Sequence, residues 1–141
     1  METRFNYING KGKLKYGDEL LDTVRNIGKN GITLVILNNK CNLADKEGEI
    51  LSDIWFDEIS TFKNGISTVR LNGKYNFINK EGELLSENWF EDVWNFNNAG
   101  VAMVKLNDKF NAIDREGKLL FDEWSHDIDD IMEMYIYGNG F

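Results

Sequence analysis

The sequence is poor in the residues that build metal centres, disulfides and nucleophilic sites. It has no proline, one cysteine and one histidine in 141 residues, so it offers neither a disulfide pair nor a typical zinc site. No apolar run approaches the roughly 20 residues that span a bilayer, and the first residues lack the apolar segment of a signal peptide. These absences predict a cytoplasmic protein without cofactors and without membrane contact.

Positive charge is also scarce. The chain carries 16 Lys and Arg against 24 Asp and Glu, which gives a net charge of −8. Such a surface repels phosphate backbones, so we expect no nucleic-acid partner. The acidic surface either keeps the protein soluble or meets a basic surface on a protein partner. Aromatic residues are plentiful at 13%, enough for a real core.

Tandem repeats of about 35 residues fill the chain. We place them at 5–40, 41–74, 75–109 and 110–141, and predict that together they form a single domain over residues 1–141. Residues of the same type recur at matching positions of the repeats, and we expect these columns to serve turns and stacking. The columns are asparagines at Asn42, Asn76 and Asn111, glycines at Gly48, Gly82 and Gly117, and tryptophans at Trp55, Trp89 and Trp124.

Each repeat reads as a three-stranded antiparallel meander followed by an aromatic connector. Val101–Leu106 has the composition of a strand, and Asn107-Asp108 follows where the preceding repeat has Asn-Gly, the strongest short hairpin signal. Phe110–Asp114 is then the return strand, Gly117 takes a left-handed turn position, and 118–120 is a short third strand. The aromatic connector 88–96 fits either a strand or a single helical turn.

One such meander does not cover its own apolar faces, so neighbouring repeats must cover each other. We expect an all-β protein whose meanders form an open, twisted, solenoid-like array. The alternative is a small closed ring resembling a four-bladed propeller, in which Met132–Tyr137 pairs with Phe5–Asn9. An open array leaves sheet edges exposed, which favours a homodimer. We expect the Trp column to hold neighbouring repeats together.

Residues 73–82, which read Gly-Lys-Tyr-Asn-Phe-Ile-Asn-Lys-Glu-Gly, and Gly100–Val104 follow the pattern of a known repeat. In these columns the chain resembles the WG-repeat family of bacterial proteins, as a divergent member. The Trp-Gly pair that names the family is replaced by aromatic-Asn, and the usual proline is missing. The resemblance implies a β-repeat array used for protein interaction, and it implies no catalytic residues.

Repeated carboxylates are the best candidates for a binding surface. Asp57 and Glu91 form a first acidic column, and Glu58, Asp92 and Asp127 form a second. Stacked repeats would align them into a ladder that suits cations or a basic partner. Together with Trp94 they are the predicted partner-binding surface. We predict no catalytic and no metal-binding residue, because acidic residues that recur at equivalent positions of successive repeats are typical of a solvent-exposed face.

Two residues often used in catalysis fall in structural columns. Cys41 takes an aromatic column, which predicts a structural thiol, and His126 takes the first acidic column, which predicts a surface position. We therefore expect no enzyme but an interaction or scaffolding module with a protein partner. The alternative is an acidic inhibitor or decoy that blocks a basic site, such as that of a nucleic-acid enzyme.

Overall fold

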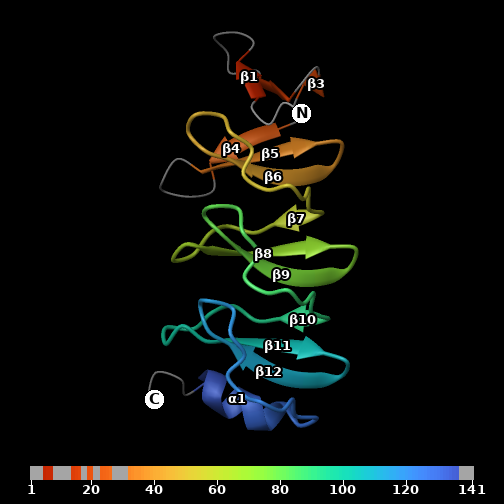
Figure 1. Ribbon diagram of the computed structural model, residues 1–141, viewed down its shortest axis with the longest axis vertical. Coiled ribbons are helices and arrows are strands. Elements are labelled where there is room, and N and C mark those ends of the chain that lie inside the picture. Colours follow the sequence, from red (N-terminus) through yellow and green to blue (C-terminus); the bar gives the residue numbers. More distant parts are fainter. Residues whose placement is uncertain (1–4, 8–13, 17–18, 21–22, 27–31, 137–141) are drawn as a thin grey trace. The chain divides into compact units, whose positions relative to one another are not determined.

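The chain folds into small antiparallel sheets, each with three strands (Figure 1). The computed structural model describes residues 5–7, 14–16, 19–20, 23–26 and 32–136. The sheets and one helix confirm the predicted class of tandem all-β meanders. In chain order the elements are β1 (Phe5–Tyr7), β2 (Leu14–Tyr16), β3 (Glu19–Leu20), β4 (Thr23–Asn26), β5 (Thr33–Leu37), β6 (Lys40–Ala44), β7 (Glu58–Ile59), β8 (Ile66–Leu71), β9 (Lys74–Asn79), β10 (Asp92–Val93), β11 (Ala102–Leu106), β12 (Lys109–Ile113) and α1 (Ile128–Ile136).

The chain divides into two compact units. The first comprises Met1–Asn72 and Ile78–Glu83, and the second comprises Gly73–Phe77 and Leu84–Phe141. The single domain over residues 1–141 stays a prediction. Among the described residues, no helix is long and apolar enough to cross a bilayer.

The third strand of each meander differs from the predicted one. Residues 118–120 contribute only an isolated bridge, between Ile113 and Leu119. The aromatic connector instead supplies the edge strand, since β10 pairs with β11 and β11 pairs with β12. The connector is therefore extended and forms no helical turn. The physical reason is that a buried asparagine side chain, described below, takes over the backbone groups that a longer third strand would have used.

Hairpin turns lie where the asparagine pairs predicted them. Asn72 and Gly73 have φ of 53° and 78°, and Asn107 and Asp108 have φ of 54° and 61°. Both residues of each pair are in the left-handed region that a type I′ turn requires. This prediction is confirmed, and the turns fix the register of the strands that follow them.

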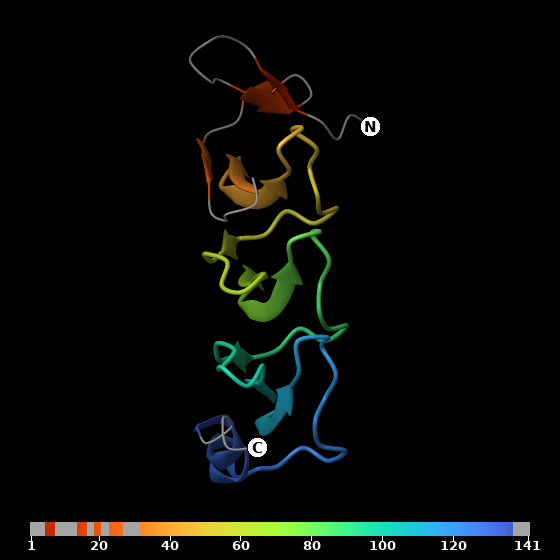
Figure 2. The ribbon, with the colours of Figure 1, turned by 90° about the vertical axis from the view of Figure 1, so that its left-hand side faces the viewer.

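Helix α1 replaces the continuation of the last repeat. The closed-ring alternative needed Met132–Tyr137 as a strand, and it is wrong because Ile128–Ile136 is helical. Asp127 begins the helix: its carboxylate accepts the N–H of Asp129 at 2.9 Å, as an N-cap does. In Figure 2 the chain after β12 runs out as a long loop and returns into α1.

The core of the second unit lies between its last sheet and α1. Ile131, which is 2% exposed, packs in one cluster with Met103 and Ala112 of β11 and β12. The whole run Val101–Val104 is buried, so both faces of β11 are covered. Trp94 packs against the edge of the same cluster. The helix thus covers apolar strand surface that would otherwise face water.

Candidate partner-binding surface

The asparagine column holds the connectors in place. The Asn76 side chain is fully buried in β9, and its amide nitrogen donates to the carbonyls of Ser86 at 2.9 Å and Asn88 at 3.1 Å. Its side-chain oxygen accepts the N–H of Phe77 at 2.7 Å. Because a buried polar group is costly unless paired, these bonds fix the connector against the strand. The equivalent Asn42 and Asn111 make matching bonds ten residues ahead, to Ser52 and Phe121.

The glycine column lies at a close contact between repeats. Gly48, Gly82 and Gly117 have φ of 84°, 84° and 85°, which confirms the predicted left-handed turn. A Cβ added at Gly82 would come within 2.7 Å of the Leu51 carbonyl oxygen, and one at Gly117 would collide with the Leu85 carbonyl. Gly82 and Gly117 therefore lie against the backbone of the preceding repeat, a role beyond the turn that their residue type indicated.

The tryptophan column is only half-buried. The fully buried aromatic is the following residue in two repeats, Phe56 and Phe90, each 0% exposed. Trp124 lies 6.4 Å from Phe90 between ring centroids, so it packs on the connector of the preceding repeat. The stacking role of the Trp column stays a prediction. In these two repeats Phe56 and Phe90 are fully buried aromatic side chains, each one residue after a tryptophan of the column.

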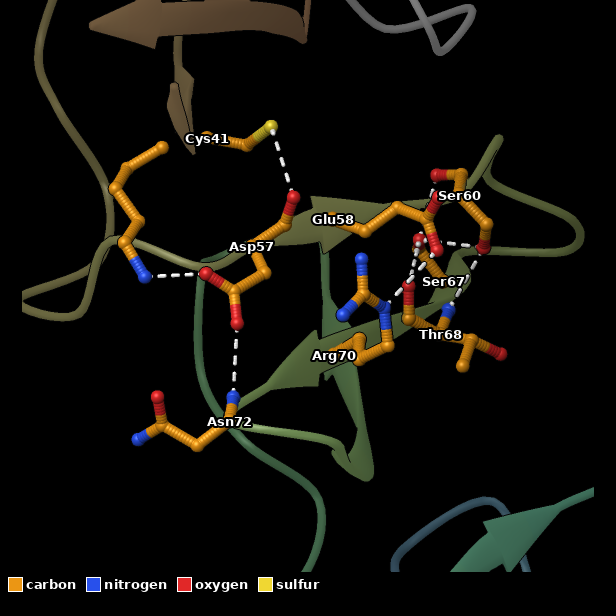
Figure 3. A network of polar contacts seen from close by, with 9 residues as sticks. Cys41, Asp57, Glu58, Ser60, Ser67, Thr68, Arg70 and Asn72 are labelled. Carbon is orange, nitrogen blue, oxygen red and sulfur yellow. Dashed lines mark hydrogen bonds and ion pairs between the residues drawn. The ribbon is translucent and has the colours of Figure 1, made fainter. Parts of the chain in front are cut away.

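The first acidic column clamps hairpin turns. The Asp57 carboxylate pairs with the Lys40 ammonium through one oxygen and accepts the N–H of Asn72 at 2.8 Å through the other (Figure 3). Glu91 repeats the second contact, because its carboxylate accepts the N–H of Asp108 at 3.1 Å. These carboxylates therefore serve the fold of their own chain before they serve any partner.

The contacts of Asp57 also change its acidity. The hydrogen bond from Lys40 is the largest influence and the N–H of Asn72 the next, and together they hold the pKa of Asp57 below the ordinary value of 3.8. Burial acts in the opposite direction but is outweighed. Asp57 is consequently a carboxylate that the fold keeps ionised.

The second acidic column faces basic residues across the strands. Glu58 stands opposite Arg70 in the register of β7 and β8, with 3.5 Å between the Glu58 Oε1 and Arg70 Nε atoms. Asp92 stands opposite Lys105 in the register of β10 and β11. Asp127 is the N-cap of α1 and leaves this pattern. The role of these acids as a partner-binding surface stays a prediction.

Trp94 and its counterpart Ser60 differ in chemistry between repeats. Trp94 is half-buried, with its ring centroid 6.3 Å from that of Phe110, so it belongs to the edge of the core. Ser60 takes part in a small polar network in which the buried Ser67 hydroxyl donates to the Ser60 carbonyl at 2.6 Å (Figure 3). One repeat fills this place with hydrogen bonds, and the next fills it with an aromatic ring.

Cys41 and His126 have the surroundings of structural residues. Cys41 is buried, and its thiol contacts the Asp57 carbonyl oxygen at 4.0 Å. His126 is exposed on the loop before α1. Within the described ranges, no group of three or more His, Cys, Asp or Glu side chains is placed to hold a metal ion.

An open pocket where the third and last repeats meet was missed by sequence reasoning. Its volume is about 440 Å³, and it is lined by residues of the β11–β12 hairpin and of the connector that follows β12. A signal was present, because position 126 holds histidine where the two preceding repeats hold Asp57 and Glu91. The lining residues are Leu106, Asn107, Lys109, Glu123 and Trp124.

The glycine turn, the buried asparagine and the clamped hairpin together define a tandem β-repeat protein. The family model described as "WG containing repeat" matches residues 43–75 and 77–110. The chain therefore contains two repeats of the WG-repeat family. The matched residues include the turn glycines Gly48 and Gly82 and the carboxylates Asp57 and Glu91, whereas the buried Asn42, Asn76 and Asn111 each lie one residue outside the matched ranges.

No curated protein matches the sequence. A crystal structure of a protein of unknown function from Bacteroides caccae is similar, with 18% identity over 79% of this chain and a TM-score of 0.36. This chain spans half the length of that protein, 50% of its residues.

Proposed function

We infer that the chain is a non-enzymatic module for protein–protein interaction, and that it binds its partner through the last repeat. The observation that carries this proposal is that the repeated polar residues make hydrogen bonds within their own chain, so they are explained by the fold and need no ligand. The buried asparagines bond connectors, and the first acidic column bonds hairpin turns. The last repeat lines an open pocket with Glu123 and Trp124, and it also carries two exposed leucines, Leu119 and Leu120.

The surface of that repeat suits a protein partner. Leu119 and Leu120 are 41% and 36% exposed, and they belong to the last repeat, which lines the pocket with Glu123 and Trp124. Half-buried Trp124 lines the pocket, and tryptophan is among the residues that most often dominate binding energy at interfaces. Apolar side chains rimmed by charged ones are typical of partner-binding patches.

Site-specific photo-crosslinking in the native cell tests this proposal. A crosslinking amino acid at Leu120 should capture a specific protein, and the same group at exposed Lys63 in the first unit should not. The Leu120→Lys variant should lose the partner while keeping the melting temperature of the wild type. Capture of the same proteins from both positions would contradict the proposal, as would a strong metabolite ligand without any specific partner.

A second candidate is an acidic decoy for a basic site, supported by the net charge of −8. Exposed Glu58, Asp92 and Asp127 would then make the contacts. The salt dependence of binding separates the two candidates. Affinity for a basic partner should fall steeply between low and high ionic strength, whereas affinity through Trp124 and Leu120 should change little.

A further inference from the structure

The pocket where the third and last repeats meet is lined by a lysine, an asparagine and two apolar side chains, besides Glu123. Lys109 brings an ammonium, Asn107 brings an amide at the hairpin, and Leu106 and Trp124 bring apolar surface. Glu123 lines the same pocket, yet Lys109 forms no ion pair with it or with any other carboxylate of the described residues. The ammonium is therefore a charge without a partner, next to an aromatic side chain.

Lys40 shows that a lysine at this position can receive a carboxylate. Lys40 is the first residue after its hairpin pair, as Lys109 is after Asn107-Asp108. Lys40 pairs with Asp57, which lies 17 residues further along the chain. Position 126 stands at the same spacing from Lys109, and it holds histidine in place of the carboxylate. The lysine is therefore kept at position 109, while the internal anion is lost at position 126.

The geometry points to a carboxylate-binding site in this pocket. Resting on the proposed function, we assign its ligand as a carboxylate of the protein partner, either an Asp or Glu side chain or the chain terminus. The carboxylate would take the place beside Lys109 that Asp57 takes beside Lys40, as a charge-assisted hydrogen bond. An apolar neighbour of the carboxylate would lie against Trp124 and Leu106. Glu123 weakens the site by repulsion, so the pocket admits a single carboxylate.

Three acetylated dipeptides serve as probes in a titration followed by nuclear magnetic resonance. Leucyl-glutamate N-methylamide carries only a side-chain carboxylate, glutaminyl-leucine carries only a terminal one, and leucyl-glutamine N-methylamide carries neither. The readout is the indole N–H resonance of Trp124, assigned with the Trp124→Phe variant. One or both carboxylate probes should shift this resonance in a saturable way, and the stronger of the two identifies the source. The neutral probe should not shift it.

Substitutions at Lys109 decide whether the charge is responsible. Lys109→Gln should weaken the better probe roughly tenfold or more, which corresponds to one charge-assisted hydrogen bond. Lys109→Arg should retain binding, and Glu123→Gln should strengthen it. Lys74→Gln is the matched control, because Lys74 has the same position in the preceding repeat and Glu91 stands at the carboxylate spacing there. An equal shift by the neutral probe, or full affinity in a folded Lys109→Gln variant, would overturn the assignment.

The failure of the site and the failure of the proposed function give different results. A specific partner that crosslinks at Leu120 but binds the Lys109→Gln variant normally removes the carboxylate site and leaves the interaction function. Saturable binding of a carboxylate probe with no specific partner in the cell removes the interaction function and leaves the site. Crosslinking at Leu120 that is lost on Lys109→Gln supports both.

Discussion

Replacing Gly82 with alanine tests how neighbouring repeats are joined. Gly82 is buried at φ +84°, and an added Cβ would lie 2.7 Å from the Leu51 carbonyl oxygen and 2.8 Å from the Leu51 Cβ. Real Cβ atoms essentially never come closer than 3.0 Å to such neighbours. The Leu51 carbonyl oxygen is a backbone atom and the Leu51 Cβ is bonded directly to the backbone, so rotating the Leu51 side chain moves neither. The turn must therefore move away from the preceding repeat.

Gly73 provides a matched control for backbone strain. It has φ +78°, and an added Cβ there has nothing within 4 Å. Alanine at either position pays the same conformational cost, roughly 1–2 kcal/mol for an L-residue in the left-handed region. Gly82→Ala adds an overpacking term of about 1–3 kcal/mol. The difference between the two variants therefore measures the contact between repeats.

Equilibrium unfolding in urea, followed by far-ultraviolet circular dichroism, gives both numbers. We expect Gly82→Ala to lower the free energy of unfolding by about 1–3 kcal/mol more than Gly73→Ala, with an unchanged urea dependence. Gly117→Ala should behave like Gly82→Ala, because its Cβ would meet the Leu85 carbonyl. Equal losses at Gly82 and Gly73 would refute the idea that the glycine column is a contact between repeats.

Three further predictions concern the other columns. Asn76→Asp should lower the free energy of unfolding in urea by roughly 3 kcal/mol or more, because a carboxylate would then face the carbonyl oxygens of Ser86 and Asn88. The exposed control Asn98→Asp should change it by less than about 0.5 kcal/mol. Phe90→Ala should cost about 3–5 kcal/mol, more than Trp89→Ala, and the reverse order would return the anchor role to the tryptophan. Asp57→Asn should be less stable than wild type above pH 3.8, and this difference should shrink as the pH falls below 3.8, since the pKa of Asp57 is lowered in the folded state. A pH-independent difference in unfolding titrations would contradict that reading.

The local signals in the sequence were sufficient for the repeat and its turns. Asn72-Gly73 and Asn107-Asp108 were readable as type I′ hairpins because both residues must accept positive φ. Helix α1 also carried a local signal that the repeat register concealed. Asp127 is a favourable N-cap, and Ile128, Ile131 and Met132 have helical spacing.

The partners of the polar residues were not readable from the sequence. A column of identical residues indicates equivalent positions, but it does not say what each side chain meets. Asparagine is a residue type that favours turns, yet Asn76 lies in the middle of a strand, and its side-chain amide donates to the Ser86 carbonyl of the connector, ten residues ahead. Asp57 and Glu91 looked like a surface ladder, yet each contacts a hairpin N–H. Such contacts depend on which distant segment of the chain folds back against each side chain, and the residue type alone does not determine this.

A difference between repeats is a better guide to function than what the repeats share. Contacts present in every repeat, such as those of the buried asparagines, are explained by the fold and need no ligand. A function located at one place in the array must use a residue that breaks the series. The first acidic column does this at His126, in the repeat that supplies Glu123 and Trp124 to the pocket that Lys109 also lines. Restoring the series with His126→Asp should supply the missing carboxylate from within the chain and abolish binding of the carboxylate probes, while the free energy of unfolding stays the same or rises.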